Sequence, residues 1–257
     1  MAFVRVENAV KYFLREDGTD MLVLDRVSFD TEEFHITCLL GPSGCGKSTL
    51  LNVISGLEPL DGGQVEVIAQ SSQDSSPRLG YVFQDPRLLN WKRVEDNLTF
   101  ALKGMKVPQA EWPTRLNKYL DLVGLSDFRG QYPLYLSGGM RQRVGLARGL
   151  VIEPQVLLMD EPFSKLDQLT ARRLRQESLH ICERLKQTTV LVTHDVEEAA
   201  YMGDRIVILC ARPARIVDIF ENPLLAHERD LDSPGFVQFK KTLLHTVLKL
   251  LEKEGSS

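Results

Sequence analysis

A glycine-rich stretch, Gly41 to Thr49, carries the most specific chemical pattern in the sequence. It fits G-x-x-x-x-G-K-[ST], in which backbone N–H groups turn inward and bind phosphate oxygens at a helix N-terminus. Lys47 places a positive charge near the outer phosphates, and Ser48 offers a hydroxyl to Mg²⁺. The pattern predicts a site for a nucleoside triphosphate with Mg²⁺, formed by Gly41, Pro42, Ser43, Gly44, Cys45, Gly46, Lys47, Ser48 and Thr49.

Two acids, Asp160 and Glu161, follow the apolar run Val156 to Met159. A continuous apolar run is typical of a buried parallel strand, and α/β sheets place ligand-binding side chains at the carboxyl ends of such strands. Asp160 is suited to hold Mg²⁺, and Glu161 is suited to act as general base on an attacking water. The alternative is that the two acids cap the helix that follows.

Two further polar residues stand at the ends of predicted strands. Gln84 follows Leu79 to Phe83 and is a candidate ligand for Mg²⁺ or for a water near the triphosphate. Its alternative role is that of a solvated loop residue. His194 follows the β-branched run Thr188 to Thr193, where it can contact a γ-phosphate and sense its loss. A lone histidine in this position can also be purely structural.

A second candidate anion site lies in Leu136 to Arg143. Ser137 is a plausible helix N-cap, and Gly138 and Gly139 expose the backbone beside it. An ordinary capped helix after a glycine turn is the alternative.

The hydrophobic patterns around these residues predict an α/β framework with an antiparallel β region at its N-terminus. Alternating runs predict strands at 3–8, 23–29 and 64–68, and buried runs predict strands at 36–40, 79–83, 156–160 and 188–193, followed by 205–210 and 214–220. Residues 94–102 and 112–123 have helical periodicity, which predicts an inserted α-helical subdomain. We expect one domain over 1–257, with an α/β core at 1–85 and 154–220, the helical subdomain at 86–153 and a helical tail at 221–257.

Two groups of aromatic or apolar side chains lie outside these motifs. Tyr12 and Phe13 are available to stack on a nucleobase, or to pack in the core. Leu88, Leu89 and Trp91 follow Gln84 closely and form either a docking surface for another subunit or a small cluster under a loop.

Composition narrows the class of protein. The 257 residues are 43% hydrophobic and 26% charged, which suits a folded α/β domain rather than a disordered chain. A net charge of −4 gives no general reason to expect nucleic acid as a partner. We find neither an apolar stretch long enough to span a membrane nor a signal peptide, and we expect a cytosolic chain. The scattered cysteines suggest no zinc site and no disulfide framework, although Cys45 could be a modifiable thiol.

Taken in order, these motifs resemble those of the ATP-binding subunit of ABC transporters over nearly the whole chain. The set comprises Gly41 to Thr49, Gln84, Leu136 to Arg143, Val156 to Pro162, Leu166-Asp167 and His194. The resemblance implies a P-loop NTPase (RecA-like) core that hydrolyses ATP. In the family, the Leu-Ser-Gly-Gly segment of one subunit faces the γ-phosphate held by the other, so we expect a homodimer in which Ser137, Gly138, Gly139 and Asp167 contact ATP.

The resemblance also implies an adenine contact and further partners. An aromatic residue two positions after a lysine stacks on adenine in the family, which indicates Phe13 after Lys11, with Tyr12 as second choice. The stretches Phe83 to Trp91, Val192 to Ala199 and Arg212 to Val217 look like those of the nitrate, sulfonate and taurine importer group. We therefore expect two membrane-spanning permease subunits, a periplasmic or surface substrate-binding protein acting indirectly, and a peripheral position on the cytoplasmic face of the membrane.

Two positions depart from the family pattern, and three alternative functions can be compared with the transporter subunit. Lys165 replaces a usual small residue on the expected dimer seam, where it adds bulk and charge, and Glu32 replaces a usual glycine in a turn. The first alternative function is a soluble ABC-type ATPase that is not coupled to transport. A P-loop kinase or GTPase has no use for Leu136 to Arg143. Against an inactive binding module stand the intact Lys47, Asp160, Glu161 and His194.

Overall fold

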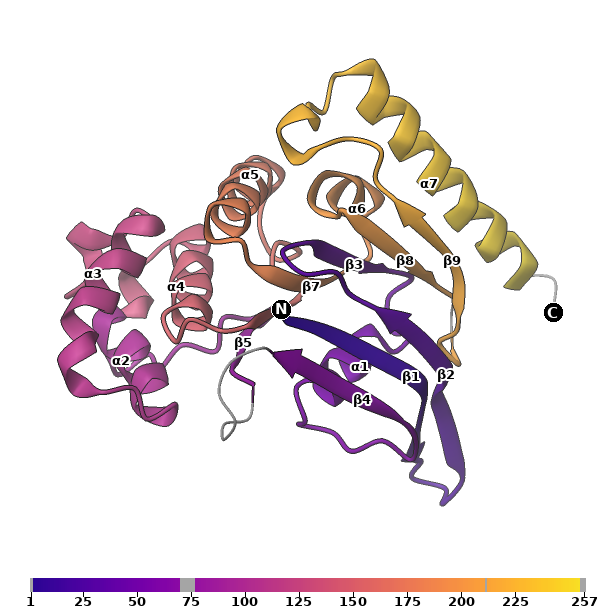
Figure 1. Cartoon of the computed structure of the whole chain (residues 1–257), viewed down its shortest axis with the longest axis horizontal. Helices are drawn as coiled ribbons and strands as arrows, with labels where there is room; N and C mark the ends of the chain where they lie inside the picture. Colours follow the sequence, from indigo (N-terminus) through magenta and orange to yellow (C-terminus); the bar gives the residue numbers. More distant parts are fainter. Residues whose placement is uncertain (1, 70–76, 211, 255–257) are drawn as a thin grey trace. The chain divides into compact units, whose positions relative to one another are not determined.

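The computed structural model describes residues 2–69, 77–210 and 212–254 (Figure 1). The chain divides into two compact units. The first contains the described residues up to 69 together with those from 188 onward, and the second contains residues 77–187. Residues 70–76, a polar stretch rich in Ser and Gln, lie outside the described residues. The domain boundaries expected from the sequence remain a prediction.

The first unit opens with the antiparallel sheet that the alternating runs predict. Its strands are β1 (Ala2–Leu14), β2 (Asp20–Asp30) and β4 (Gly62–Ala69), in the order β2-β1-β4. Strand β1 continues well past its predicted end at Asn8, because register shifts on either side of Ala9 keep it paired with β2. Tyr12 and Phe13 are therefore strand residues, paired with Leu22 and Met21.

The second sheet region of this unit supports the phosphate loop. Strand β3 (Ile36–Leu40) lies between β7 (Thr188–Thr193) and β8 (Arg205–Leu209) and is parallel to both. Strand β9 (Ile216–Glu221) pairs with β8 in the antiparallel sense. Every residue of β3 and β7 is buried, which confirms the expectation drawn from their continuous apolar and β-branched runs.

The turn that leads into β3 shows how the chain accommodates Glu32. The His35 amide donates to the Glu32 carbonyl at 3.3 Å, so a turn forms there without glycine. Phe34, with φ 65°, adopts the left-handed conformation. The Glu32 side chain lies 3.2 Å from Nδ1 of His35.

The described residues of the first unit also form four helical segments: α1 (Lys47–Ile54), α6 (Val196–Met202), the short 3₁₀ segment η4 (Ala226–Glu228) and α7 (Pro234–Glu254). Helix α7, yellow in Figure 1, packs on α6, where Tyr201 and Phe236 meet edge to face. Phe236 and Leu243 are buried while Leu244 is exposed, so α7 packs on the unit with one face. The Leu250 side chain lies outside the described residues.

The second unit is mainly helical. Strands β5 (Leu79–Val82) and β6 (Val156–Asp160) form a parallel pair. Between them lie α2 (Val94–Gly104), α3 (Trp112–Leu122), α4 (Gly138–Leu150) and three 3₁₀ segments, η1 (Gln109–Glu111), η2 (Ser126–Phe128) and η3 (Pro133–Tyr135). Helix α5 (Gln168–Leu185) follows β6. None of the helices in the described residues has the length and apolar character needed to cross a membrane.

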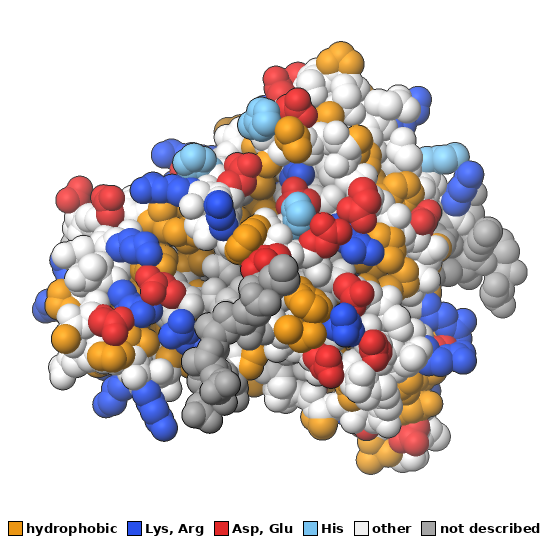
Figure 2. Space-filling model, in the orientation of Figure 1, with side chains coloured by type: hydrophobic (Ala, Val, Ile, Leu, Met, Phe, Trp, Pro, Cys, Tyr) orange, Lys and Arg blue, Asp and Glu red, His pale blue; other side chains and the backbone are white. Residues whose placement is uncertain are grey.

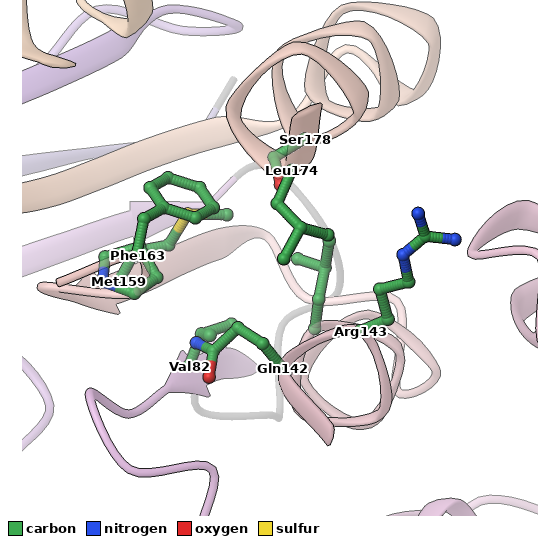
Figure 3. Close-up of a pocket in the computed structure, with 9 residues that line it drawn as sticks. Val82, Gln142, Arg143, Met159, Phe163, Leu174 and Ser178 are labelled. Atoms are coloured by element: carbon green, nitrogen blue, oxygen red, sulfur yellow. The ribbon is translucent and has the colours of Figure 1, made fainter. Parts of the chain in front are cut away.

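The core beneath the acid pair of this unit is closely packed. Side chains from β5, β6, α4 and α5 surround a cavity of about 10 Å³, which is at the lower limit for one water molecule. Figure 3 shows Met159 and Phe163 on one side of it and Leu174 on another, with Arg143 directed away. Phe163 is buried only two residues after Glu161, so it anchors the turn that presents this acid.

Candidate functional site

The glycine-rich stretch forms the loop between β3 and α1, as predicted. A Cβ atom on Gly41 would lie 2.8 Å from the Leu209 carbonyl oxygen and 3.1 Å from Sγ of Cys45, so this position admits only glycine without a shift. Gly46, with φ 117°, directly precedes α1. The loop is therefore close-packed against β8 and enters the helix through a left-handed residue.

The ammonium of Lys47 is held by the loop itself. The side chain is buried, and its Nζ donates to the carbonyl oxygens of Gly41 and Pro42, each at 2.8 Å. Ser48 is exposed in the first turn of α1. This arrangement places a positive charge and a hydroxyl at one helix N-terminus, which suits binding of phosphate oxygens.

Cys45 has a packing role in this loop. Its side chain is buried beside the space that a Gly41 side chain would fill. Burial raises the pKa of the Cys45 thiol, which opposes formation of the reactive thiolate. All four cysteines of the chain remain thiols in the structure. The interpretation of Cys45 as a small buried side chain is therefore favoured over that of a modifiable thiol.

The end of β7 lies beside the start of the loop. The Gly41 amide donates to the Thr193 carbonyl at 3.3 Å, and His194 is the next residue. His194 is exposed, and Asp195 caps α6 by accepting hydrogen bonds from the amides of Glu197 and Glu198. The cap fixes the backbone that follows His194. The structure thus brings His194 to the part of the first unit that contains the loop.

The two candidate adenine contacts differ in their surroundings. Tyr12 is 43% exposed, whereas Phe13 is half-buried with the Lys11 ammonium 5.2 Å from its ring centroid. Phe13 pairs with Met21 across the strands, and Met21 is in contact with Arg212, which in turn bonds to Gly44 of the loop. Paired residues share one face of a sheet, so Phe13 lies on the same face as Met21, which contacts Arg212. The arrangement favours Phe13 over Tyr12.

In the second unit, Gln84 and Glu161 lie together. Nε2 of Gln84 is 3.4 Å from Oε2 of Glu161 and 3.0 Å from Oγ of Ser164. The Ser164 hydroxyl also donates to the Glu161 carbonyl at 3.0 Å. The contact between Gln84 and Ser164 joins residues 80 positions apart, so no local pattern in the sequence indicates it.

Glu161 has an unusual backbone conformation. Its φ is 42°, in the left-handed region that side-chain-bearing residues seldom adopt. Such strain costs on the order of 1–3 kcal/mol, and it persists only where the surroundings impose it. The buried residues Pro162 and Phe163 hold the turn from below. A carboxylate held in this way is typical of a functional site.

The candidate magnesium ligands all offer oxygen atoms. They are the Ser48 hydroxyl in the first unit, and the Gln84 amide and Asp160 carboxylate in the second. Burial raises the pKa of Tyr81, and the negative charge of Asp160 raises it further. Within the described residues, no group of three or more His, Cys, Asp or Glu side chains could hold a metal alone. This donor set fits Mg²⁺, which is commonly bound by one carboxylate together with substrate phosphates.

The second candidate anion site is formed as a helix start. The Ser137 side chain accepts a hydrogen bond from the Met140 amide at 3.2 Å, which confirms the predicted N-cap of α4. A Cβ atom on Gly139 would lie 2.8 Å from Cγ2 of Thr170, so α4 and the start of α5 approach closely. Asp167 caps α5 by accepting from the Thr170 amide at 3.0 Å, and hydrogen bonding to Thr170 lowers its pKa. The Ser137–Gly139 segment and Asp167 thus belong to one part of the second unit.

A groove of about 410 Å³ lies on the second unit, beside the residues that precede Gln84. Tyr81 and Phe83 stack within it with ring centroids 4.2 Å apart, and the Arg87 guanidinium covers Phe83 at 4.5 Å. Its lining also includes Phe100, Met105 and Arg148. Trp91 is 74% exposed, while Leu88 and Leu89 are half-buried.

Charged side chains of both signs are interspersed on the face shown in Figure 2. This pattern agrees with the small net charge of the chain, −4. It offers no extended basic stripe on that face of the kind that binds a phosphate backbone.

Comparisons with known proteins agree with this geometry. The ABC transporter family model matches residues 24–164. The taurine import ATP-binding protein TauB of Rhizobium johnstonii is 41% identical over 85% of this chain and 83% of its own length. The aliphatic sulfonates import ATP-binding protein SsuB of Bacillus cereus is 38% identical over 94% of each chain.

Solved structures lead to the same family. The dimeric post-hydrolysis state of an ATP-binding cassette bound to ADP and Pi has a TM-score of 0.71 and 28% sequence identity, covering 86% of this chain and 100% of its own. A second dimeric structure, of a bacterial ABC transporter cassette, has a TM-score of 0.73 and 27% identity, with the same coverage. The family match runs from β2 through the phosphate loop to the turn after Glu161, and the chain therefore belongs to the ABC transporter family.

Proposed function

We propose that this chain is the ATP-hydrolysing subunit of an importer for taurine or another aliphatic sulfonate. The observation that carries the proposal is the identity of 38–41% with TauB and SsuB over most of both chains. A soluble ABC-type ATPase not coupled to transport remains the alternative function, and it is not favoured by these relatives.

The chain's own residues suit the steps of ATP hydrolysis. The loop from Gly41 to Thr49 holds the phosphates. The Lys47 ammonium, which already donates to carbonyl oxygens of the loop, supplies a positive charge beside them. Phe13 stacks on the adenine. Glu161 accepts a proton from the attacking water, and Gln84 orients that water through the contact between the two side chains. His194 contacts the γ-phosphate. Ser48, Gln84 and Asp160 would hold Mg²⁺, which would neutralise charge on the phosphate oxygens.

The active form would be a dimer of two identical chains around two ATP molecules. The chain has one phosphate loop and one Leu-Ser-Gly-Gly segment, so each ATP would take the loop from one copy and Ser137 to Gly139 from the other. Asp167 would lie at the same seam. The two similar solved structures are dimers, and one contains ADP and Pi, which supports this arrangement.

The partners would be two membrane-spanning permease subunits. The groove beside Tyr81 and Phe83, together with the exposed Trp91, offers apolar and basic side chains to a docking segment. Such docking would place this chain on the cytoplasmic face of the membrane. A periplasmic or surface substrate-binding protein would deliver the sulfonate without touching this subunit.

Growth on defined sulfur sources tests the cargo. Cells that lack this chain should not grow with taurine or an alkanesulfonate as the only sulfur source, and should grow normally with sulfate. A wild-type copy should restore growth, whereas a Glu161→Gln copy should not. Normal growth on sulfonates, with loss of growth on nitrate as the only nitrogen source, would show that the cargo is wrong while the ATPase function stands.

A further inference from the structure

Arg212 connects the turn after β8 to the phosphate loop. Its Nε donates to the carbonyl oxygen of Gly44 at 2.5 Å, and its Nη1 lies 3.5 Å from Sδ of Met21. Gly44 has φ 77°, a conformation that glycine adopts readily. The guanidinium thus holds the middle of the loop from a strand turn 168 positions away in the chain.

The turn that carries Arg212 is fixed to β2. The Ala214 amide donates to the Val23 carbonyl at 2.8 Å, and the Asp25 amide donates to the Ala214 carbonyl at 3.0 Å. Gly46, at the other end of the loop, is close to the same strand, because a Cβ there would lie 3.1 Å from the Val23 side chain. The turn, β2 and the loop therefore form one packed group.

The contact has a direct consequence for the amide that follows Gly44. In a trans peptide the carbonyl and the N–H point in opposite directions, so a bond that fixes one also fixes the other. With the Gly44 carbonyl bound by Arg212, the Cys45 N–H points away from Arg212, and it donates to the Pro42 carbonyl at 3.3 Å. Pro42 also accepts from Lys47, so this N–H points toward the part of the loop that holds the ammonium.

We propose that Arg212 is a positioning residue for phosphate binding, acting through the Gly44 carbonyl to keep the Cys45 N–H turned into the loop. The proposal rests on the proposed role of this loop in binding ATP. An amide already turned inward would exchange its bond to the Pro42 carbonyl for one to phosphate without reorienting, so the contact would lower the cost of binding. Direct contact between the Arg212 guanidinium and the nucleotide is the competing explanation.

A matched set of variants separates the two explanations. Glutamine carries an N–H donor at the same number of bonds from Cα as arginine Nε, without the charge, and methionine has a similar length without a donor. Arg212→Gln should therefore preserve the contact with Gly44, and Arg212→Met should remove it. Arg215→Gln is the control, because Arg215 lies in the same turn but pairs with Asp25 instead of the loop.

Binding of tripolyphosphate and of ATP to the purified full chain should be measured by calorimetry. We expect Arg212→Met to bind both ligands roughly 3- to 10-fold more weakly, the range for loss of one net hydrogen bond. Arg212→Gln and Arg215→Gln should stay within about 2-fold of wild type on the same scale. Wild-type affinity in Arg212→Met would overturn the proposal. Equal weakening in Arg212→Gln and Arg212→Met would overturn it in favour of a direct charge contact.

Two controls keep these outcomes distinct from other failures. The melting temperatures of the ligand-free variants should match wild type within about 2 °C, since one exposed contact contributes little to unfolding. If Arg212→Met does not fold, retained binding in Arg212→Gln supports positioning by the hydrogen bond, and lost binding contradicts it. Lys47→Ala should abolish binding. A wild-type chain that binds neither ligand would disprove the ATP site itself.

Discussion

The Lys165 ammonium lies 3.6 Å from the Asp85 carboxylate. The pair joins the turn after β6 to the residue that follows Gln84, beside the contact between Gln84 and Ser164. Both side chains are more than half exposed, so the ion pair contributes little to the free energy of unfolding. It nevertheless gives Lys165 a partner within its own chain. The expectation that Lys165 adds bulk and charge to the dimer seam remains a prediction.

A double-mutant cycle should measure the strength of this pair. Lys165→Ala and Asp85→Asn should each change the free energy of unfolding by less than ~1 kcal/mol, with a coupling of ~0.2–1 kcal/mol. The coupling should decrease in 1 M salt, because exposed charges are screened there. A coupling that is absent in low salt would show that the contact has no energetic role.

Replacing Glu161 by Gln should lower ATP turnover by ~10² to 10⁴, the usual effect of losing a general base. The amide is close in size to the carboxylate and can still lie beside Gln84, so ATP binding should survive. Steady-state hydrolysis and equilibrium binding of ATP check the two parts separately. Near-normal turnover would remove Glu161 from the role of base.

The Glu161→Gln protein also tests the dimer. Light scattering should show a monomer without ATP and a dimer with ATP, because each ATP would join the loop of one copy to Ser137–Gly139 of the other. Lys47→Ala in the same background should stay monomeric. If ATP binds and no dimer forms, adding Lys165→Ala distinguishes hindrance by that side chain, which the change would relieve, from a need for the permease subunits.

Gly41→Ala should destabilise the fold by ~1–3 kcal/mol, the cost of overpacking a closely packed position. The added Cβ would lie 2.8 Å from the Leu209 carbonyl oxygen. Gly104→Ala is the matched control, since nothing lies within 4 Å of its Cβ and it belongs to helix α2. Denaturant unfolding should show loss of stability in the first variant and little change or a small gain in the second. Equal stability of the two would contradict the packing of the loop.

Glu153 should make the stability depend on pH. Burial alone would raise its pKa, but a hydrogen bond from Lys118 at 3.0 Å and the Arg115 charge at 3.1 Å outweigh burial and lower the pKa. A lowered pKa adds stability above the unfolded-state value, and this stability is lost as pH falls through the folded-state value. Glu153→Gln should therefore be less stable than wild type at pH 7 by up to ~1 kcal/mol, after allowance for solvent screening.

Unfolding in urea at several pH values measures this difference. It should shrink as pH falls below about 4.3, where the glutamate protonates in the unfolded chain, and should be lost once pH is below the lowered folded-state pKa. A difference independent of pH would mean that packing of the side chain, instead of its charge, is responsible.

The parts of this protein that depend on neighbouring residues were predictable from the sequence. The phosphate loop lies between a buried strand and a helix because its glycines and flanking apolar runs require that local geometry. The Ser137 cap followed from residue type and position for the same reason. The family and the fold class were therefore accessible without a structure.

The contacts that join distant segments were not predictable. Arg212 meets Gly44, and Gln84 meets Ser164, only because strands far apart in the chain pair side by side. The extension of β1 to Leu14 depended on register shifts beside Ala9, which no local pattern reveals. Periodicity reports which face of an element is buried, and it does not report which partner covers that face.

The groove on the second unit lies next to candidate catalytic residues. Tyr81 and Phe83 line it, and Gln84 is the next residue, with its amide on Ser164 and near Glu161. Under the proposed function, a docking side chain that tilts the stacked rings would thus act one peptide bond away from the amide that contacts the proposed general base. A permease subunit docked in this groove would then influence hydrolysis through adjacent residues, without a long chain of intermediate contacts.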